Sequence, residues 1–153
     1  MNTEMEVLTD TLIHIDEVRE NLEEMIHDLR LRAIKHDRSK LQEPEFSIFV
    51  STKPKFKKVN YGTKEYEEVA AEAHEAVLHH YEHNRHHTKH HVEGIYDMNL
   101  LDMLEMLADW KAAARRSPDL SFKDSLPTAF KKYGFDETLQ RIFMNTLEYL
   151  GWI

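Results

Sequence analysis

The stretch that decides the fold is residues 74–91, HEAVLHHYEHNRHHTKHH, which holds eight of the chain's eleven histidines. No glycine or proline occurs between Thr63 and Gly94, so we expect one long helix there. Residues three and four apart share a helix face, which predicts two stripes: His79, His83, His86 and His90 on one, and His80, Asn84, His87 and His91 on the next. A solvated face would favour Glu and Lys, which are better helix formers. Imidazole binds borderline metals, so the pattern indicates a metal or substrate site.

The composition favours one all-helical domain. With 153 residues and only four glycines and four prolines, we expect a single compact α-helical domain, 1–153, of about six helices. The 28 acids against 20 Lys plus Arg give a formal charge of -8, which argues against a general nucleic-acid or membrane-surface binder. The absence of cysteine excludes disulfides and thiolate ligands and fits a cytoplasmic protein. We find no apolar run of membrane-spanning length and no signal-peptide pattern.

Apolar spacing and chain breakers place the elements before the histidines. We expect a first amphipathic helix that begins at Thr3 and ends or bends between Met25 and Arg32, and a short element over 39–50 that Pro44 interrupts.

Residues 51–62, STKPKFKKVNYG, are typical of a lysine-rich loop, either solvated or a lid over an anionic ligand. Thr63 is expected to cap the His-rich helix. Three further helices are expected over 98–116, 122–133 and 137–150, with Asp97, Ser121 and Asp136 as their N-caps.

The helix expected over 98–116 is apolar nearly all round, except for one acidic stripe made by Asp102, Glu105 and Asp109. A buried carboxylate is costly unless it is paired or bound to metal. The stripe is therefore either a narrow solvated edge or the lining of an internal site.

If this helix and the His-rich helix form an antiparallel hairpin at Gly94, His80 lies opposite Asp109. His86 and His87 then lie roughly 9–10 Å nearer the turn at 1.5 Å per residue. The hairpin makes His80 and Asp109 a ligand pair and leaves His86 and His87 for a second metal or a phosphate.

Adjacent His36 and Asp37 can bind one cation together only where the chain turns, as at a helix end. Lys40 follows one helical turn after His36, where it can meet a phosphate oxygen as a point charge. On a straight helix His14 would lie roughly 33 Å from His36, so it joins such a site only if the chain reverses between them.

A helical histidine, HDRSK at residues 36–40, a His-rich helix and a late aspartate together resemble the HD-domain superfamily of metal-dependent phosphohydrolases. Those proteins are all-helical and place His, His-Asp and a distal Asp around a metal that activates water. The resemblance implies that one divalent ion is held by His14, His36, Asp37 and Asp109. It leaves His80, His86 and His87 for a second metal or the phosphate. The GYP signature of the variant that hydrolyses cyclic dinucleotides is absent, so the sequence does not predict a cyclic dinucleotide as the substrate.

A second similarity covers nearly the whole chain. HDRSKLQEPEF, the HxxxNxHH pattern and EMLADWKAA look like an uncharacterised family found in phages and Firmicutes, which has no established activity. The polar positions that this resemblance implies are shared are His14, His36, Asp37, Ser39, Lys40, Glu45, His80, Asn84, His86, His87 and Asp109. The remaining histidines of the stretch, His74, His79, His83, His90 and His91, are outside the shared positions.

The sequence thus predicts a cytoplasmic, metal-dependent phosphohydrolase acting on a small nucleotide or other phosphate ester, in the host cytoplasm if it is phage-encoded. Catalytic candidates are Lys40, Glu45 and His86, and substrate contacts are Lys40, Asn84, His86 and His87. The predicted metal ligands are His14, His36, Asp37, His80, His87 and Asp109. Such ligands suit a divalent Mn, Fe, Ni, Co, Zn or Mg ion.

In this interpretation the metal lowers the pKa of its bound water and polarises the phosphoryl group, and Lys40 neutralises the negative charge that develops on the phosphate. Asn84 orients a histidine or binds substrate, and Glu45 is either a base or a residue that positions a ligand. The alternatives are a non-catalytic HD-like nucleotide- or metal-binding protein, such as a phage-encoded sponge for a signalling nucleotide, and a metal-stabilised structural subunit. The expected partner is a small phosphorylated ligand, without nucleic acid or membrane, and a homo-oligomer is compatible with the sequence.

Overall fold

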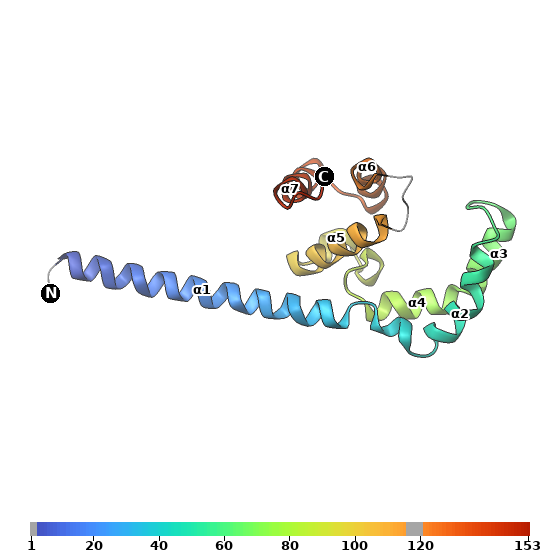
Figure 1. The fold of residues 1–153 in the computed structure, drawn as a ribbon, viewed down its shortest axis with the longest axis horizontal. Helices are drawn as coiled ribbons and strands as arrows, with labels where there is room; N and C mark the ends of the chain where they lie inside the picture. Colours follow the sequence, from blue (N-terminus) through green and yellow to red (C-terminus); the bar gives the residue numbers. More distant parts are fainter. Residues whose placement is uncertain (1–2, 116–120) are drawn as a thin grey trace. The chain divides into compact units, whose positions relative to one another are not determined.

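The protein is all-α over the part of the chain that the structure describes. The structure is a computed structural model that describes residues 3–115 and 121–153. Seven α-helices and no strand occur over these residues (Figure 1), which confirms the all-α prediction with one helix more than the six expected. The chain divides into two compact units, Met1–His36 and Asp37–Ile153, and a single domain over 1–153 stays a prediction. No helix among these residues is long and apolar enough to cross a membrane.

Unit 1 is a single helix, α1, which spans Thr3–Lys35. The predicted end between Met25 and Arg32 is wrong, because no glycine or proline interrupts the helix. An ion pair between Arg32 and Asp28, 2.5 Å apart, adds support between neighbouring turns. The helical hydrogen bonds run on to His36, whose N–H donates to the Arg32 carbonyl at 2.7 Å.

Asp37 ends the helical path with a φ of 57°, the one positive φ at a non-glycine residue in the described ranges. Aspartate tolerates the left-handed region better than most residues because its short polar side chain can hydrogen-bond locally. The 3-10 helix η1 (Arg38–Leu41) follows directly. Within that turn Lys40 reaches back to the Asp37 carboxylate, with Nζ to Oδ2 at 2.6 Å.

The first half of unit 2 consists of η1, α2 (Glu45–Phe56), α3 (Lys64–Glu72) and α4 (His74–His83). Helix α2 lies against η1, α3 and α4, so residues distant in sequence meet along it (Figure 1). The predicted interruption at Pro44 is confirmed, because η1 ends at Leu41 and α2 begins directly after Pro44.

The predicted loop over 51–62 is wrong for residues 51–56, which belong to α2. Pro54 is tolerated inside α2 because it removes only one backbone hydrogen bond close to the helix end. The Lys55 ammonium pairs with Glu72 of α3, which ties the end of α2 to its neighbour.

The long helix predicted from Thr63 to Gly94 does not form. Thr63 does cap a helix, since its hydroxyl accepts from the Tyr66 N–H at 3.2 Å, but α3 ends at Glu72 and α4 at His83. Asn84 then adopts an extended conformation. Its side-chain amide donates to the His80 carbonyl at 2.7 Å, a local bond of the kind that competes with helix continuation. The two predicted histidine stripes are therefore wrong beyond residue 83.

Residues 84–99 form irregular chain with two 3-10 helices, η2 (Thr88–His90) and η3 (Gly94–Asp97). Because this segment replaces the predicted turn at Gly94, the simple antiparallel hairpin is wrong as well. The placement of His80 opposite Asp109, which depended on this hairpin, therefore has no support from the fold.

The apolar core of unit 2 lies among α5 (Leu100–Ala114), α6 (Phe122–Tyr133) and α7 (Glu137–Tyr149). The predicted ranges for α6 and α7 are confirmed, and the Asp136 carboxylate caps α7 by accepting from the Leu139 N–H at 2.8 Å. The cap of α5 is Asn99, in a capping box with Asp102, and not Asp97. The predicted end of this helix near Arg116 lies outside the described residues.

The core predicts a stability effect at Leu126, which is 1% exposed. Leu126→Ala should lower the free energy of unfolding by about 3 kcal/mol, because it removes buried methyl groups and leaves a cavity. Urea unfolding followed by circular dichroism measures this loss. Leu104→Ala, at a side chain 41% exposed on α5, is the control. Equal losses for the two variants would contradict the assignment of the core.

Candidate metal centre

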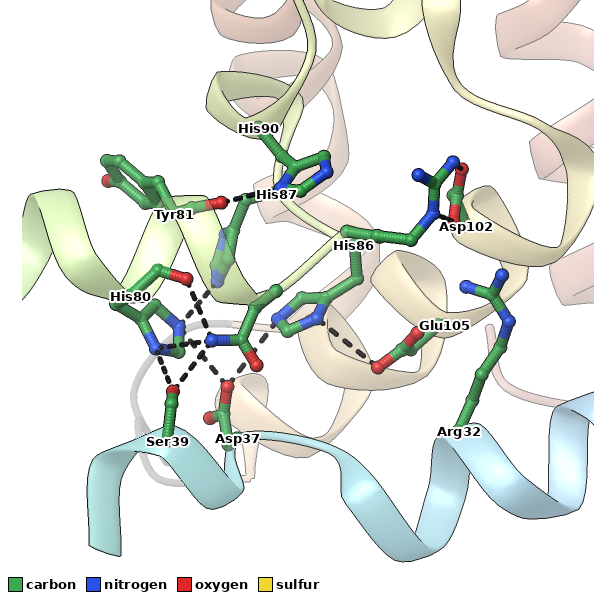
Figure 2. A network of polar contacts seen from close by, with 12 residues as sticks. Arg32, Asp37, Ser39, His80, Tyr81, His86, His87, His90, Asp102 and Glu105 are labelled. Carbon is green, nitrogen blue, oxygen red and sulfur yellow. Dashed lines mark hydrogen bonds and ion pairs between the residues drawn. The ribbon is translucent and has the colours of Figure 1, made fainter. Parts of the chain in front are cut away.

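Four side chains of unit 2 converge on one point. Asp37, His80, His86 and His87 each offer one ligand atom, and these atoms all lie within 4.8 Å of one another. Asp37 Oδ1 lies 3.2 Å from His80 Nε2 and 3.6 Å from His86 Nε2. The Nε2 atoms of His80 and His87 are 2.8 Å apart. Figure 2 shows the three imidazoles and the carboxylate turned toward one another. We call these four residues the cluster.

The tautomer of His80 is set by Glu45. The Glu45 carboxylate is fully buried, and its Oε2 lies 2.9 Å from His80 Nδ1. A carboxylate accepts, so Nδ1 carries the proton and Nε2 presents a lone pair to the cluster. That lone pair faces Asp37 Oδ1 and His87 Nε2, which are also acceptors unless protonated. Electrostatics therefore requires a proton or a metal cation between these three atoms.

A second layer of hydrogen bonds holds Glu45 in place. Its other oxygen accepts from His79 Nδ1 at 2.8 Å, and the Ser39 hydroxyl also bonds it. Burial favours the neutral acid, but hydrogen bonds from His79, Ser39 and His80 outweigh it and keep the Glu45 pKa below its usual value. Asn84 donates to the Ser39 hydroxyl at 2.7 Å. The network joins η1, α2 and α4 around one ionised carboxylate.

An acid of α5 also lies beside His86. His86 Nδ1 lies 3.3 Å from Glu105 Oε1, while its Nε2 faces Asp37, and the side chain is 1% exposed (Figure 2). Glu105 is not among the site residues predicted from the sequence. The signal that points to it is the acidic stripe, whose second member is Glu105.

The acidic stripe of Asp102, Glu105 and Asp109 lines the polar interior of unit 2, and its three carboxylates contact different groups. Asp102 is fully buried and accepts from the Arg85 guanidinium at 2.9 and 3.1 Å. Asp109 lies close enough to His87 for its charge to raise that pKa. The carboxylate oxygens of Asp37 and Asp109 lie within 4.8 Å of each other. Of the two interpretations of the stripe, the lining of an internal site agrees with this placement.

His87 is held neutral by its surroundings. Burial first, and then the neighbouring imidazoles of His86 and His80, lower its pKa to about 3, although the charges of Asp109 and Asp37 oppose the shift. A neutral imidazole is the form that binds a metal, so His87 needs no proton release to act as a ligand. The rings of His86 and His87 are centred 4.1 Å apart, and those of His80 and His87 4.8 Å apart. All three thus belong to one cluster, whereas the sequence places His86 and His87 nearer the turn than His80.

The predicted ligands His14 and His36 belong to unit 1. Because α1 is continuous, 22 residues at 1.5 Å per residue separate them by roughly 33 Å. The chain reversal that His14 needs does not occur between them, so His14 and His36 of one chain cannot bind the same ion. This is a correction to the predicted ligand set, while His36 as a ligand stays a prediction.

Four of the histidines outside the shared positions have contacts that support the site or the chain around it. His79 supports Glu45, and His83 stacks on His79 with ring centres 3.9 Å apart. His90 Nδ1 lies 2.8 Å from the Tyr81 carbonyl, and His91 Nε2 lies 2.8 Å from the Arg85 carbonyl. These contacts hold the chain that leaves α4 in its irregular path.

A family model described as "Family of unknown function (DUF5662)" matches residues 3–149. No curated protein and no solved structure matches the chain. The family's description assigns no ligand, so the chemistry of the site must be argued from its geometry.

The network around Glu45 predicts a stability effect that does not depend on metal. Glu45→Gln should lower the free energy of unfolding by about 2 kcal/mol, because the amide leaves one imidazole N–H without its charged acceptor in a buried site. Urea unfolding in the presence of a chelator measures it. Glu43→Gln, at an exposed acid two residues away, is the matched control and should change little. A Glu45→Gln protein as stable as the wild type would contradict the buried network.

Proposed function

We propose that this chain, which belongs to the DUF5662 family of unknown function, is a metal-dependent phosphohydrolase that acts on a small phosphate ester such as a nucleotide. One observation carries the proposal. Three imidazole nitrogens and one carboxylate oxygen lie together, with the tautomer of His80 set so that its lone pair points inward.

The donor set fits a divalent transition metal. Around an ion with ligands about 2.1 Å away, tetrahedral donors lie about 3.4 Å apart. Three donor separations in the cluster, 2.8, 3.2 and 3.6 Å, scatter around that spacing. Imidazole with one carboxylate favours Zn, Mn, Fe, Co or Ni over Ca. Asp37, His80, His86 and His87 would hold the ion, with Asp109 close to the cluster.

Two of these ligands have a supporting group of the kind that metal sites use. Glu45 accepts from His80 and Glu105 lies against His86, in the carboxylate–histidine arrangement that orients a ligand and raises its basicity. Glu45 is fully buried with both oxygens occupied, so we assign it this positioning role and not that of a general base. His86 has its two nitrogens directed to Glu105 and Asp37, which favours a ligand over a proton carrier.

A divalent ion in the cluster supplies a water of lowered pKa and polarises a phosphoryl oxygen. The chain's own contribution to phosphate binding is Lys40. Its ammonium is bound to Asp37 Oδ2 at 2.6 Å and its side chain is 42% exposed, so a short side-chain movement carries it to an anion beside the cluster. There it neutralises the charge that develops as the phosphate ester bond breaks.

Space for the organic part of a substrate lies next to Lys40. A cavity of about 460 Å³ is lined by Lys40, Leu41, Phe46, Phe49, Val50, Thr52, Lys53 and Phe56. Apolar and aromatic walls with two ammonium groups suit a ligand that has a flat or apolar body and an anionic group. A nucleoside phosphate has this composition.

Metal content tests the cluster directly. His87→Ala should weaken zinc or manganese binding by more than about 100-fold, because even the loss of a residue that only supports a ligand costs about 10- to 100-fold. Isothermal titration of chelator-treated protein measures the affinity. His83→Ala is the control, since His83 is exposed and bonds only the preceding turn. Equal affinity of the two variants would remove His87 from the site.

Turnover tests the reaction. Metal-loaded wild type should release phosphate or nucleoside from at least one member of a panel of nucleoside mono-, tri- and cyclic phosphates, and Asp37→Ala should release none. Lys40→Ala should lower kcat/KM by about 100-fold at unchanged metal content, because one charged contact in the transition state is lost.

Lys40→Arg should restore part of the rate, and Lys57→Ala, at an exposed lysine beyond α2, is the control. Stoichiometric binding of an unchanged nucleotide would contradict the enzyme and favour the nucleotide-binding alternative. Metal binding without any nucleotide effect would favour the structural subunit.

A further inference from the structure

The amphipathic face of α1 has no partner within unit 1. A lone helix buries none of its residues, and Leu12, Ile15, Leu22 and Met25 are each 52–55% exposed. In water most helical stability comes from packing such a face, so a 33-residue helix of this kind requires a partner.

The apolar residues follow a seven-residue repeat. Leu8, Ile15, Leu22 and Leu29 stand at one position of the repeat, and Val18 and Met25 at the other, with Leu12 and Ile26 on the flank. At about 100° per residue, this stripe is a narrow seam, the form that fits a second helix lying nearly parallel or antiparallel to α1.

Charge along α1 selects the direction of that second helix. Residues 3–24 carry eight acids, Glu4, Glu6, Asp10, Asp16, Glu17, Glu20, Glu23 and Glu24, and one base, Arg19. Residues 25–36 carry three bases, Arg30, Arg32 and Lys35, and one acid, Asp28. A parallel copy would set acid against acid along residues 3–24, whereas an antiparallel copy sets the acidic residues 4–10 of one helix against the basic residues 30–36 of the other and also opposes the two helix dipoles.

We propose that α1 pairs antiparallel with α1 of a second copy of this chain. A two-fold axis near Glu20 sets Ile15 opposite Met25 of the second copy and Val18 opposite Leu22, so that the four central apolar residues of the seam meet one another, while Leu8 and Leu29 lie opposite Arg32 and Thr11 at its ends. Leu12 and Ile26 close the same flank. The seam is self-complementary in this register, which is the property that a contact between identical chains requires.

The pairing also assigns a place to His14. In this register, His14 lies on the edge of the seam near the Asp28 carboxylate of the second copy, far from its own His36. The interface is independent of the metal centre, so its test needs neither metal nor turnover.

Sedimentation equilibrium of the full chain tests the interface. Wild type should sediment as a dimer, and Leu22→Asp should sediment as a monomer, because two carboxylates would then lie in the seam. Ile13→Asp is the matched control, since Ile13 is exposed to the same 52% but points away from the seam. A monomeric wild type, or a Leu22→Asp protein that stays dimeric, would overturn the proposal.

Cross-linking tests direction and register, and the chain has no cysteine to interfere. Ile15→Cys mixed with Met25→Cys should place about half of the chains in a disulfide-linked dimer after exchange, as random pairing of two copies predicts. Each variant alone should give none, because like positions lie about 15 Å apart in this register and a disulfide needs Cα atoms within about 7 Å. A dimer from Ile15→Cys alone would indicate parallel pairing, and no dimer from the mixture would indicate another partner; either overturns the proposal.

Discussion

The arrangement of unit 2 around its candidate metal centre depends on one buried carboxylate. Glu45 is fully buried and accepts from His79 and His80, the adjacent histidines on α4. An ionised acid cannot stay in such a place without hydrogen-bond donors, so α2 and α4 must lie together. The same bonds set the proton on His80 Nδ1 and direct its other nitrogen to Asp37. The same hydrogen bonds of Glu45 therefore hold α2 against α4 and orient His80 in the site.

The irregular chain after α4 brings His86 and His87 next to His80. On a continuous helix, His86 and His87 would lie one to two turns beyond His80, too far to share an ion with it. The extended backbone at Asn84 folds the chain back, and ring centres then lie 4.1 to 6.1 Å apart among the three histidines. Asn84, which the sequence assigns to orienting a histidine or binding substrate, bonds the His80 carbonyl and Ser39. Its contacts agree with the orienting role.

Helix α5 connects the centre to the core. Its apolar face packs with α6 and α7, and its acidic stripe is directed to the histidine-rich segment. Glu105 lies beside His86 and the charge of Asp109 acts on the pKa of His87, while Asp102 completes the capping box of Asn99 and accepts from Arg85. A destabilised core would thus also disturb the second carboxylate that orients the cluster.

The all-α class, the ranges of α6 and α7, and the caps at Thr63 and Asp136 can be read from the sequence. The sequence also singles out Asp37, His80, His86, His87 and Asp109 as candidate site residues, but it divides them between two sites. These features follow from local patterns: apolar periodicity, capping residues and an unusual density of imidazole. Four features cannot be read in this way: the end of α1, the break between α3 and α4 at Ala73, the irregular segment after His83, and the role of Glu105. After His83 and at Glu105, side-chain contacts decide the outcome, because helix propensity differs by less than about 1 kcal/mol between ordinary residues. A buried hydrogen bond of Asn84 or Glu45 contributes as much or more, and the sequence does not state which residues it joins.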